Sequence, residues 1–116
     1  MKADLREYDS VRVWYEGLRR QSNIDPDADP QRIQVLRQFC EFVGKELDAI
    51  VRECLRESGD QVKISLKGRR LYAAKITEFE QRDGTAAPQE RARIGNTLRG
   101  FLIHNGIFLQ PPSLLR

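Results

Sequence analysis

The sequence has few of the residues that common catalytic and metal sites use. It contains one histidine and two cysteines, and the cysteines are not in a Cys-x-x-Cys arrangement. Zinc sites built from histidine and cysteine are therefore excluded. A glycine-rich phosphate-binding motif and a hydrolase set of serine, histidine and aspartate are also missing. We expect this chain to carry no catalytic residues, no metal and no cofactor.

Long apolar segments are missing as well. No apolar run approaches the roughly 20 residues that a membrane span requires. The first ten residues, MKADLREYDS, lack the apolar centre of a signal peptide. We therefore expect a cytoplasmic protein with no membrane partner. Cys40 and Cys54 fit that compartment, because both lie on apolar stripes and are expected to be buried thiols.

The composition is that of a soluble domain with a mild positive charge. Hydrophobic residues make up 40% and charged residues 32% of the 116 positions, with a net charge of +3. This length favours one domain over residues 1–116. Fifteen of the 20 cationic side chains are arginine, which favours bidentate contacts with phosphate or guanine. Residues 61–77 hold five cations and no acid, whereas residues 23–29 hold three aspartates.

Apolar residues recur at helical spacing in five segments. The predicted helices cover residues 4–20, 30–43, 46–58, 66–82 and 88–104. Asp29 before Pro30 is a typical helix start, Gly44 a typical end, and Ser65 a typical cap. Residues 61–66 alternate like a strand, but without a partner strand we expect an extended connector. The sequence predicts an all-α, compact, irregular bundle of four to five helices.

Three short polar segments are predicted to end helices. They are residues 58–60, residues 83–85 and the pair Asn105–Gly106. Residues 107–112 are then expected to run extended, out of the domain. His104 is expected to interact with the dipole at the end of the last helix. The three tyrosines lie on apolar stripes and are expected in the core: Tyr8, Tyr15 and Tyr72.

The last predicted helix has two faces. One is an apolar stripe made by Ile94, Leu98, Phe101 and Leu102. The other carries Arg93, Asn96 and Arg99, beside Gly100, which leaves room for another backbone. Arginine contacts phosphate or guanine and asparagine contacts adenine, so this face is predicted to contact duplex DNA. Ile103 is expected on the same outward side.

The start of the second predicted helix offers further contacts. Gln31 and Gln34 are hydrogen-bonding groups near a helix N-terminus, which favours phosphate. Arg32 is aligned with the apolar stripe and is expected to reach toward the helix start.

The start of the fourth predicted helix is cationic. Lys67 and Arg70 are expected to face outward, with Arg69 nearer the packed side. Positive charge at a helix N-terminus opposes the helix dipole. This local cost indicates that the charge serves a partner.

Two segments resemble a known family. RIQVLRQFCEFVGKELDAI, residues 32–50, is similar to an arginine-rich helix ending in Phe-x-x-Phe, followed by a break and a Leu-Asp-x-Ile helix start. LRGFLIHNGIFLQPP, residues 98–112, is similar to a closing Leu-Arg-x-Phe helix with an Asn-Gly stop and a proline exit. Both patterns are those of the N-terminal SAM-like core-binding domain of tyrosine recombinases, the phage-integrase type.

The resemblance implies a helical domain that clamps one side of a DNA duplex. The partners it implies are double-stranded DNA, a catalytic domain of the same parent protein and other recombinase protomers, in a prokaryotic cytosol. The contacts it implies come from the start of the second helix and from the last helix: Gln31, Arg32, Arg93, Asn96 and Arg99. The family's catalytic arginines, histidines and tyrosine are not in this chain, so it would bind DNA without cutting it.

The sequence also departs from the family. Ala28–Asp29 stands where a serine or threonine often leads into the second helix, and Arg32 stands where a tyrosine is common. The acidic residues 25–29 would repel a nearby phosphate backbone. Two other readings stay open: a helical protein-interaction domain with an incidental basic surface, and a small enzyme.

Overall fold

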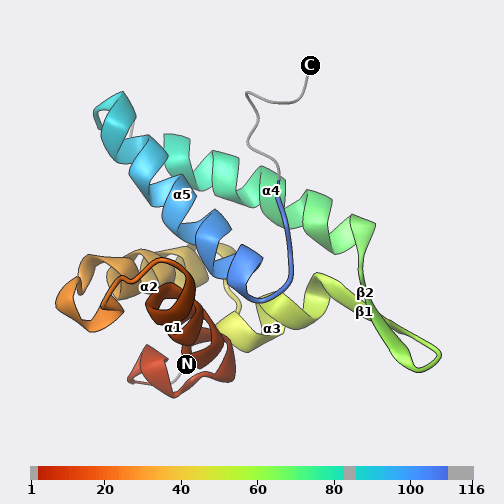
Figure 1. Ribbon diagram of the computed structural model, residues 1–116. Helices are drawn as coiled ribbons and strands as arrows, with labels where there is room; N and C mark the ends of the chain where they lie inside the picture. The colour runs from red at the N-terminus through yellow and green to blue at the C-terminus, as the bar shows by residue number, and fades with distance from the viewer. Residues whose placement is uncertain (1–2, 83–85, 110–116) are drawn as a thin grey trace.

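A computed structural model describes residues 3–82 and 86–109. The described residues form α1 (Asp9–Gln21), α2 (Gln31–Val43), α3 (Leu47–Glu53), β1 (Leu55–Ser58), β2 (Gln61–Ile64), α4 (Leu66–Gln81) and α5 (Pro88–His104) (Figure 1). Single 3-10 turns at Leu5–Glu7 and Pro26–Ala28 precede α1 and α2. The predicted break at 83–85 and the end of the predicted exit, 110–112, lie outside the described residues.

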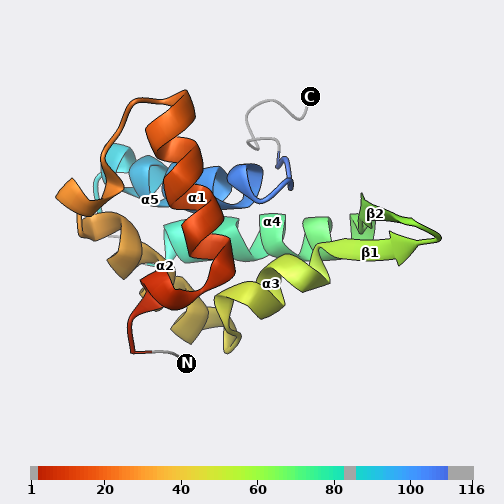
Figure 2. The ribbon, with the colours of Figure 1, turned by 60° about the horizontal axis from the view of Figure 1, so that its bottom comes forward.

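The predicted compact helical bundle is confirmed, with one small β-hairpin added. α1 packs against α5 and α3, and α2 packs against α5 and α4. α4 and α5 lie side by side and antiparallel, and the hairpin projects from the body beside the start of α4 (Figures 1 and 2). Among the described residues, no helix combines the length and apolar character that crossing a bilayer requires.

The core lies where α1, α2, α4 and α5 converge. Trp14 of α1 meets Phe101 of α5 edge to face, with ring centroids 5.7 Å apart. Phe39 of α2 meets Phe79 of α4 at 5.4 Å in the same way. The expected burial of both cysteines, all three tyrosines and the apolar stripe of α5 is confirmed, except that Ile94 is only half-buried.

Helix boundaries follow local capping groups. Gly44 ends α2 at a φ of 71°, a left-handed conformation that glycine adopts easily, and the Ser65 side chain accepts a bond from the N–H of Gly68. Asn105 ends α5, and its side-chain Nδ2 atom donates to the carbonyl of Ser10, 3.0 Å away. The predicted extended exit is wrong at its start, because Ile107 and Leu109 are buried in the core.

The predicted first helix is divided at Tyr8. The carboxylate of Asp4 accepts the N–H of Arg6 and starts a 3-10 turn, and Tyr8 is then extended at a ψ of 138°. The Ser10 N–H donates to Asp48 at 3.1 Å, which fixes the start of α1 on α3.

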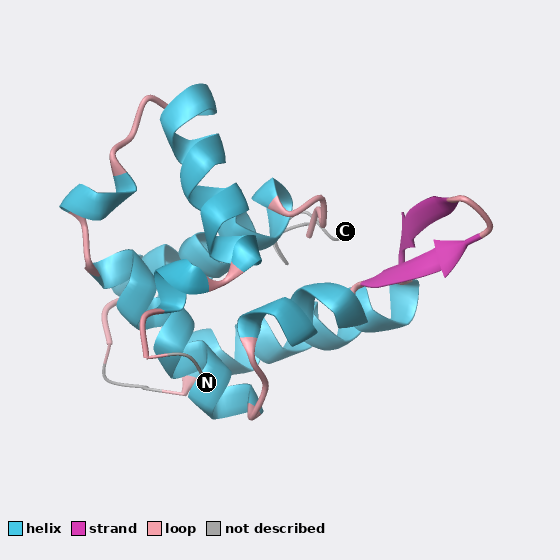
Figure 3. Cartoon of the chain, turned by 90° about the horizontal axis from the view of Figure 1, so that it is seen from below, coloured by secondary structure: helices cyan, strands magenta, loops and turns pink. Residues whose placement is uncertain are grey.

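The predicted third helix is confirmed but is too long at its C-terminal end, and the predicted connector is wrong. α3 ends at Glu53, and residues 55–58 form β1, which pairs antiparallel with β2. Leu55 pairs with Ile64 and Ser58 with Gln61, so Gly59 and Asp60 form a two-residue turn. Gly59 has a φ of 63°, as the first position of a type II′ hairpin turn requires. Residues 61–64 therefore do have a partner strand, which Figure 3 shows projecting from the helices.

Candidate nucleic-acid interface

An open groove of about 520 Å³ runs between α1, the start of α2 and one face of α5. We call it the α2/α5 groove. Its apolar floor comes from Trp14, Leu18, Ala92 and Gly100. Its polar lining comes from Arg32 of α2 and from Gln89, Arg93, Asn96, Thr97 and His104 of α5. Three residues that the sequence selected, Arg32, Arg93 and Asn96, therefore meet in one place.

Three of the polar lining residues were not selected from the sequence. Gln89 and His104 belong to the same helical face as Arg93 and Asn96, so extending that spacing along α5 would have found them. The Nδ1 atom of His104 lies 2.8 Å from the Gly100 carbonyl oxygen, at the end of α5, where this residue was expected to interact with the helix dipole. Thr97 gives its hydroxyl to the carbonyl of Arg93, 2.9 Å away.

The two arginines of the groove have weak internal partners. Arg93 donates to Glu90 at 2.6 Å, and both side chains are about half exposed. This hydrogen bond lowers the pKa of the Glu90 carboxyl and raises that of the Arg93 guanidinium. Arg32 is 3.9 Å from Asp29. Exposed pairs contribute little to stability, so Arg93 can exchange its carboxylate for a phosphate at small cost. Arg32 is half-buried, and its long ion-pair distance leaves its guanidinium only loosely held.

Arg99 does not line this groove, and its predicted position on the outward face of the helix is wrong. It is 8% exposed, and its Nη2 atom lies 2.5 Å from Oε1 of Glu80 on α4. Each three-residue step rotates a position by about 60° around a helix. Two such steps from Arg93 carry Arg99 onto the side that faces α4. A Cβ at Gly95 would overlap the Glu80 carboxyl group, so this glycine makes room for the pair.

The start of α2 differs in detail from the prediction. Pro30 takes the capping position, and α2 begins at Gln31. The Asp29 carboxylate accepts the N–H of Gln31 at 3.0 Å, so it occupies the helix end that was expected to favour phosphate. Gln31 and Gln34 are exposed, but neither lines the groove.

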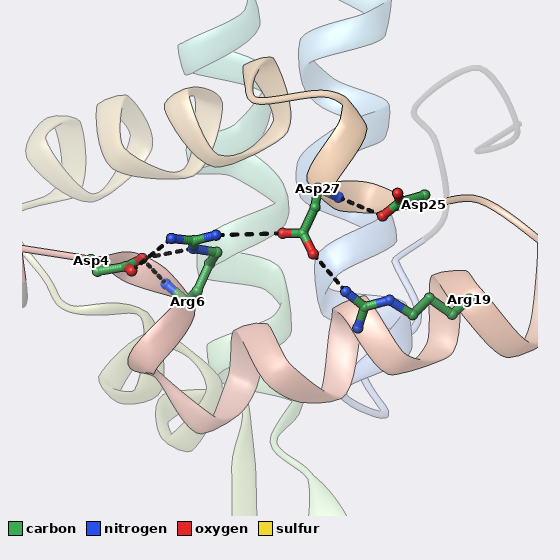
Figure 4. A network of polar contacts seen from close by, with 5 residues as sticks. All are labelled: Asp4, Arg6, Arg19, Asp25 and Asp27. Atoms are coloured by element: carbon green, nitrogen blue, oxygen red, sulfur yellow. Dashed lines mark hydrogen bonds and ion pairs between the residues drawn. The ribbon is translucent and has the colours of Figure 1, made fainter.

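Asp27 of the acidic linker is neutralised within the chain (Figure 4). Asp27 contacts Arg19 at 2.8 Å and Arg6 at 3.6 Å, from two different segments. The carboxylate of Asp25 accepts the N–H of Asp27 at 3.1 Å. The repulsion expected between this linker and a phosphate backbone is therefore reduced by cations that the linker already holds.

The cations at the start of α4 lie apart from the groove. Lys67 and Arg70 are exposed and Arg69 is half-buried, as predicted. At about 1.5 Å per residue, Lys67 and Glu80 are about 20 Å apart along α4. Glu80 meets α5 at Gly95 and Arg99, so the α2/α5 groove lies toward the far end of α4. The predicted contacts thus fall on two separate surfaces.

The thiols and the most buried tyrosine are unsuited to nucleophilic chemistry. Burial raises the pKa of Cys40 to about 12 and that of Cys54 to about 11. Burial and the hydrogen bond to Glu53 also raise the pKa of Tyr72. Within residues 3–82 and 86–109, no group of three or more histidine, cysteine or acidic side chains is placed to hold a metal ion.

The α2/α5 groove is therefore a shallow surface with two guanidinium groups, two side-chain amides and an imidazole around an apolar floor. An open groove of this kind suits an extended anionic polymer better than a small ligand, which requires enclosure. No protein-family model, no curated protein and no solved structure matches this chain.

Proposed function

We propose that this domain binds duplex DNA through the α2/α5 groove. It acts as the core-binding module of a site-specific tyrosine recombinase of the phage-integrase type. The observation that supports this most is the convergence of Arg32 with Arg93 and Asn96 on one open groove. These residues come from two helices that are distant in the sequence, and they combine the two side-chain types that recognise phosphate and base edges.

The roles follow from the chemistry of each side chain. Arg32 and Arg93 bind phosphate oxygens and fix the position of the domain on the duplex. Asn96 is exposed beside them and offers both a donor and an acceptor to a base edge. A Cβ at Gly100 would meet nothing within 4 Å, so a sugar-phosphate backbone has room there. In this proposal the catalytic domain of the parent protein cuts the DNA that this module holds.

The proposal is tested by the salt dependence of duplex binding. Fluorescence anisotropy with a labelled duplex of mixed sequence gives the dissociation constant at each salt concentration. Arg32→Gln and Arg93→Gln should each weaken binding and reduce the slope of log affinity against log salt by about 0.9, one phosphate contact. Arg12→Gln is the matched control, because Arg12 is an exposed arginine of α1 outside the groove.

Two results would contradict the proposal. If the unaltered domain has no affinity for duplex at the lowest workable salt, the recombinase assignment loses its basis and the protein-interaction reading replaces it. If Arg32→Gln and Arg93→Gln behave like Arg12→Gln, the α2/α5 groove is not the contact surface.

A further inference from the structure

The β-hairpin has one basic, polar face. Side chains alternate between the two faces of a strand, so Arg56 and Ser58 of β1 share a face with Gln61 and Lys63 of β2. Arg56 and Lys63 are direct cross-strand partners. Like charges in directly opposed positions destabilise a hairpin. The pair therefore costs stability in the free domain, and an anion placed over it would remove that cost.

Three more cations follow at the start of α4. With Arg56 and Lys63 they make up what we call the hairpin surface: Arg56, Lys63, Lys67, Arg69 and Arg70. Within the described residues, none of these five forms an ion pair, whereas most cations elsewhere in those residues hold a carboxylate.

The acids nearest in sequence do not neutralise this surface. Glu57 is the cross-strand partner of Val62 and so lies on the opposite face of the hairpin. Glu53, at the end of α3, is engaged by Lys45 at 3.4 Å and by the Tyr72 hydroxyl at 2.7 Å. Asp60 lies in the turn at the tip, beyond the paired residues. The charge of the hairpin surface is therefore available to an external anion.

The hairpin is placed to reach such a partner. It projects beyond the helices in all three views (Figures 1–3). Its base is fixed to the body, because the N–H of Ser65 donates to the carbonyl of Cys54 at 2.8 Å and Gly68 packs against the carbonyl of Glu53. A two-stranded ribbon is one of the two elements that the major groove of DNA admits.

We propose that the hairpin surface is a second contact surface for duplex DNA, used together with the α2/α5 groove. This inference rests on the proposed function and extends it. Lys67 and Glu80 are about 20 Å apart along α4, and Glu80 contacts α5 at Gly95 and Arg99. We therefore expect the two surfaces to contact separate stretches of the phosphate backbone, each adding its own contribution to the salt dependence.

The test compares three double variants that each remove two positive charges. Arg56→Gln/Lys63→Gln should lower the salt slope by about 1.8, or two phosphate contacts. Its melting temperature should be unchanged or higher, because the opposed cations are gone. Arg12→Gln/Arg20→Gln, on exposed positions of α1, should leave the slope unchanged. Lys67→Gln/Arg70→Gln should weaken binding as much as the hairpin variant does. Both residues lie in α4, so this variant removes charge without altering either strand.

The outcomes separate this inference from the proposed function. If the domain binds duplex and Arg93→Gln weakens it, but both hairpin-surface variants bind like the parent, the hairpin surface is overturned and the groove stands. If the hairpin-surface variants weaken binding while the groove variants do not, the hairpin surface is supported and the groove is overturned. If the unaltered domain does not bind, both proposals are overturned.

Discussion

Arg93 and Arg99 lie on one helix and were predicted to share one role, yet their surroundings separate them. The side chain of Arg93 is 40% exposed beside Glu90, whereas the side chain of Arg99 is 10% exposed beside Glu80. The sequence places both arginines off the apolar stripe, but it does not show that α4 covers one flank of α5. Burial by a neighbouring helix therefore decides which arginine can contact a ligand.

Removing one partner of the buried pair should destabilise the fold. Glu80→Gln leaves the Arg99 guanidinium without a carboxylate in a site with little solvent, which should cost about 2 kcal/mol or more of unfolding free energy. Urea denaturation measures this change. Glu90→Gln is the matched control, because its partner Arg93 is exposed, and its midpoint should barely move. Equal decreases in unfolding free energy for the two variants would show that the buried Glu80–Arg99 pair contributes no more to stability than the exposed Glu90–Arg93 pair.

At the level of helices and strands, the sequence predicts α2, α4 and α5 well because their ends carry capping residues. Three of these ends carry a residue that typically starts or ends a helix, and such a residue can be recognised from its sequence neighbours alone: Gly44, Ser65 and Pro88. The end of α3 has no such mark. Leu55 continues the helical spacing of Leu47 and Val51, so the pattern alone extends the helix through a residue that the structure places in β1.

The hairpin was missed because its determinants are not local to either strand. The carbonyl of Cys54 accepts the N–H of Ser65, and this hydrogen bond closes the base of the hairpin. The two residues are farther apart in the sequence than the three- and four-residue spacings by which a helix is recognised. The tripeptide Ser58-Gly59-Asp60 was interpreted as a helix end, although glycine at this position also starts a type II′ turn. Once residues 55–58 were assigned to a helix, residues 61–64 had no strand to pair with.

Two glycine substitutions should have opposite effects on stability. A Cβ at Gly68 would overlap the backbone carbonyl of Glu53, so Gly68→Ala forces α4 away from α3 and should cost about 2 kcal/mol. A Cβ at Gly100 meets nothing within 4 Å, so Gly100→Ala should stabilise α5 by up to about 1 kcal/mol. Thermal or urea unfolding of both variants checks this. A neutral Gly68→Ala would show that the α3–α4 junction is looser than the structure indicates.

For the domain as a whole, the sequence locates the cations but not their grouping. It selects Arg32, Arg93 and Asn96 as contacts, and the fold brings them to one groove. It also selects Lys67 and Arg70, but the length of α4 sets them at the other end of the molecule. Neither the separation of the two surfaces nor the neutralised linker around Asp27 can be derived from helical periodicity, because both depend on tertiary contacts.

Both proposals require that duplex DNA contacts the α2/α5 groove and the hairpin surface. Titration of the isotopically labelled domain with a duplex at low ionic strength tests these contacts most directly, because each backbone amide reports separately. Amide signals of Arg32, Arg93, Asn96, Arg56 and Lys63 should move, and added salt should reverse the shifts. Signals around Arg12 and Glu16 on α1 should stay in place. Unmoved signals at both surfaces, with duplex in excess, would show that neither surface contacts DNA.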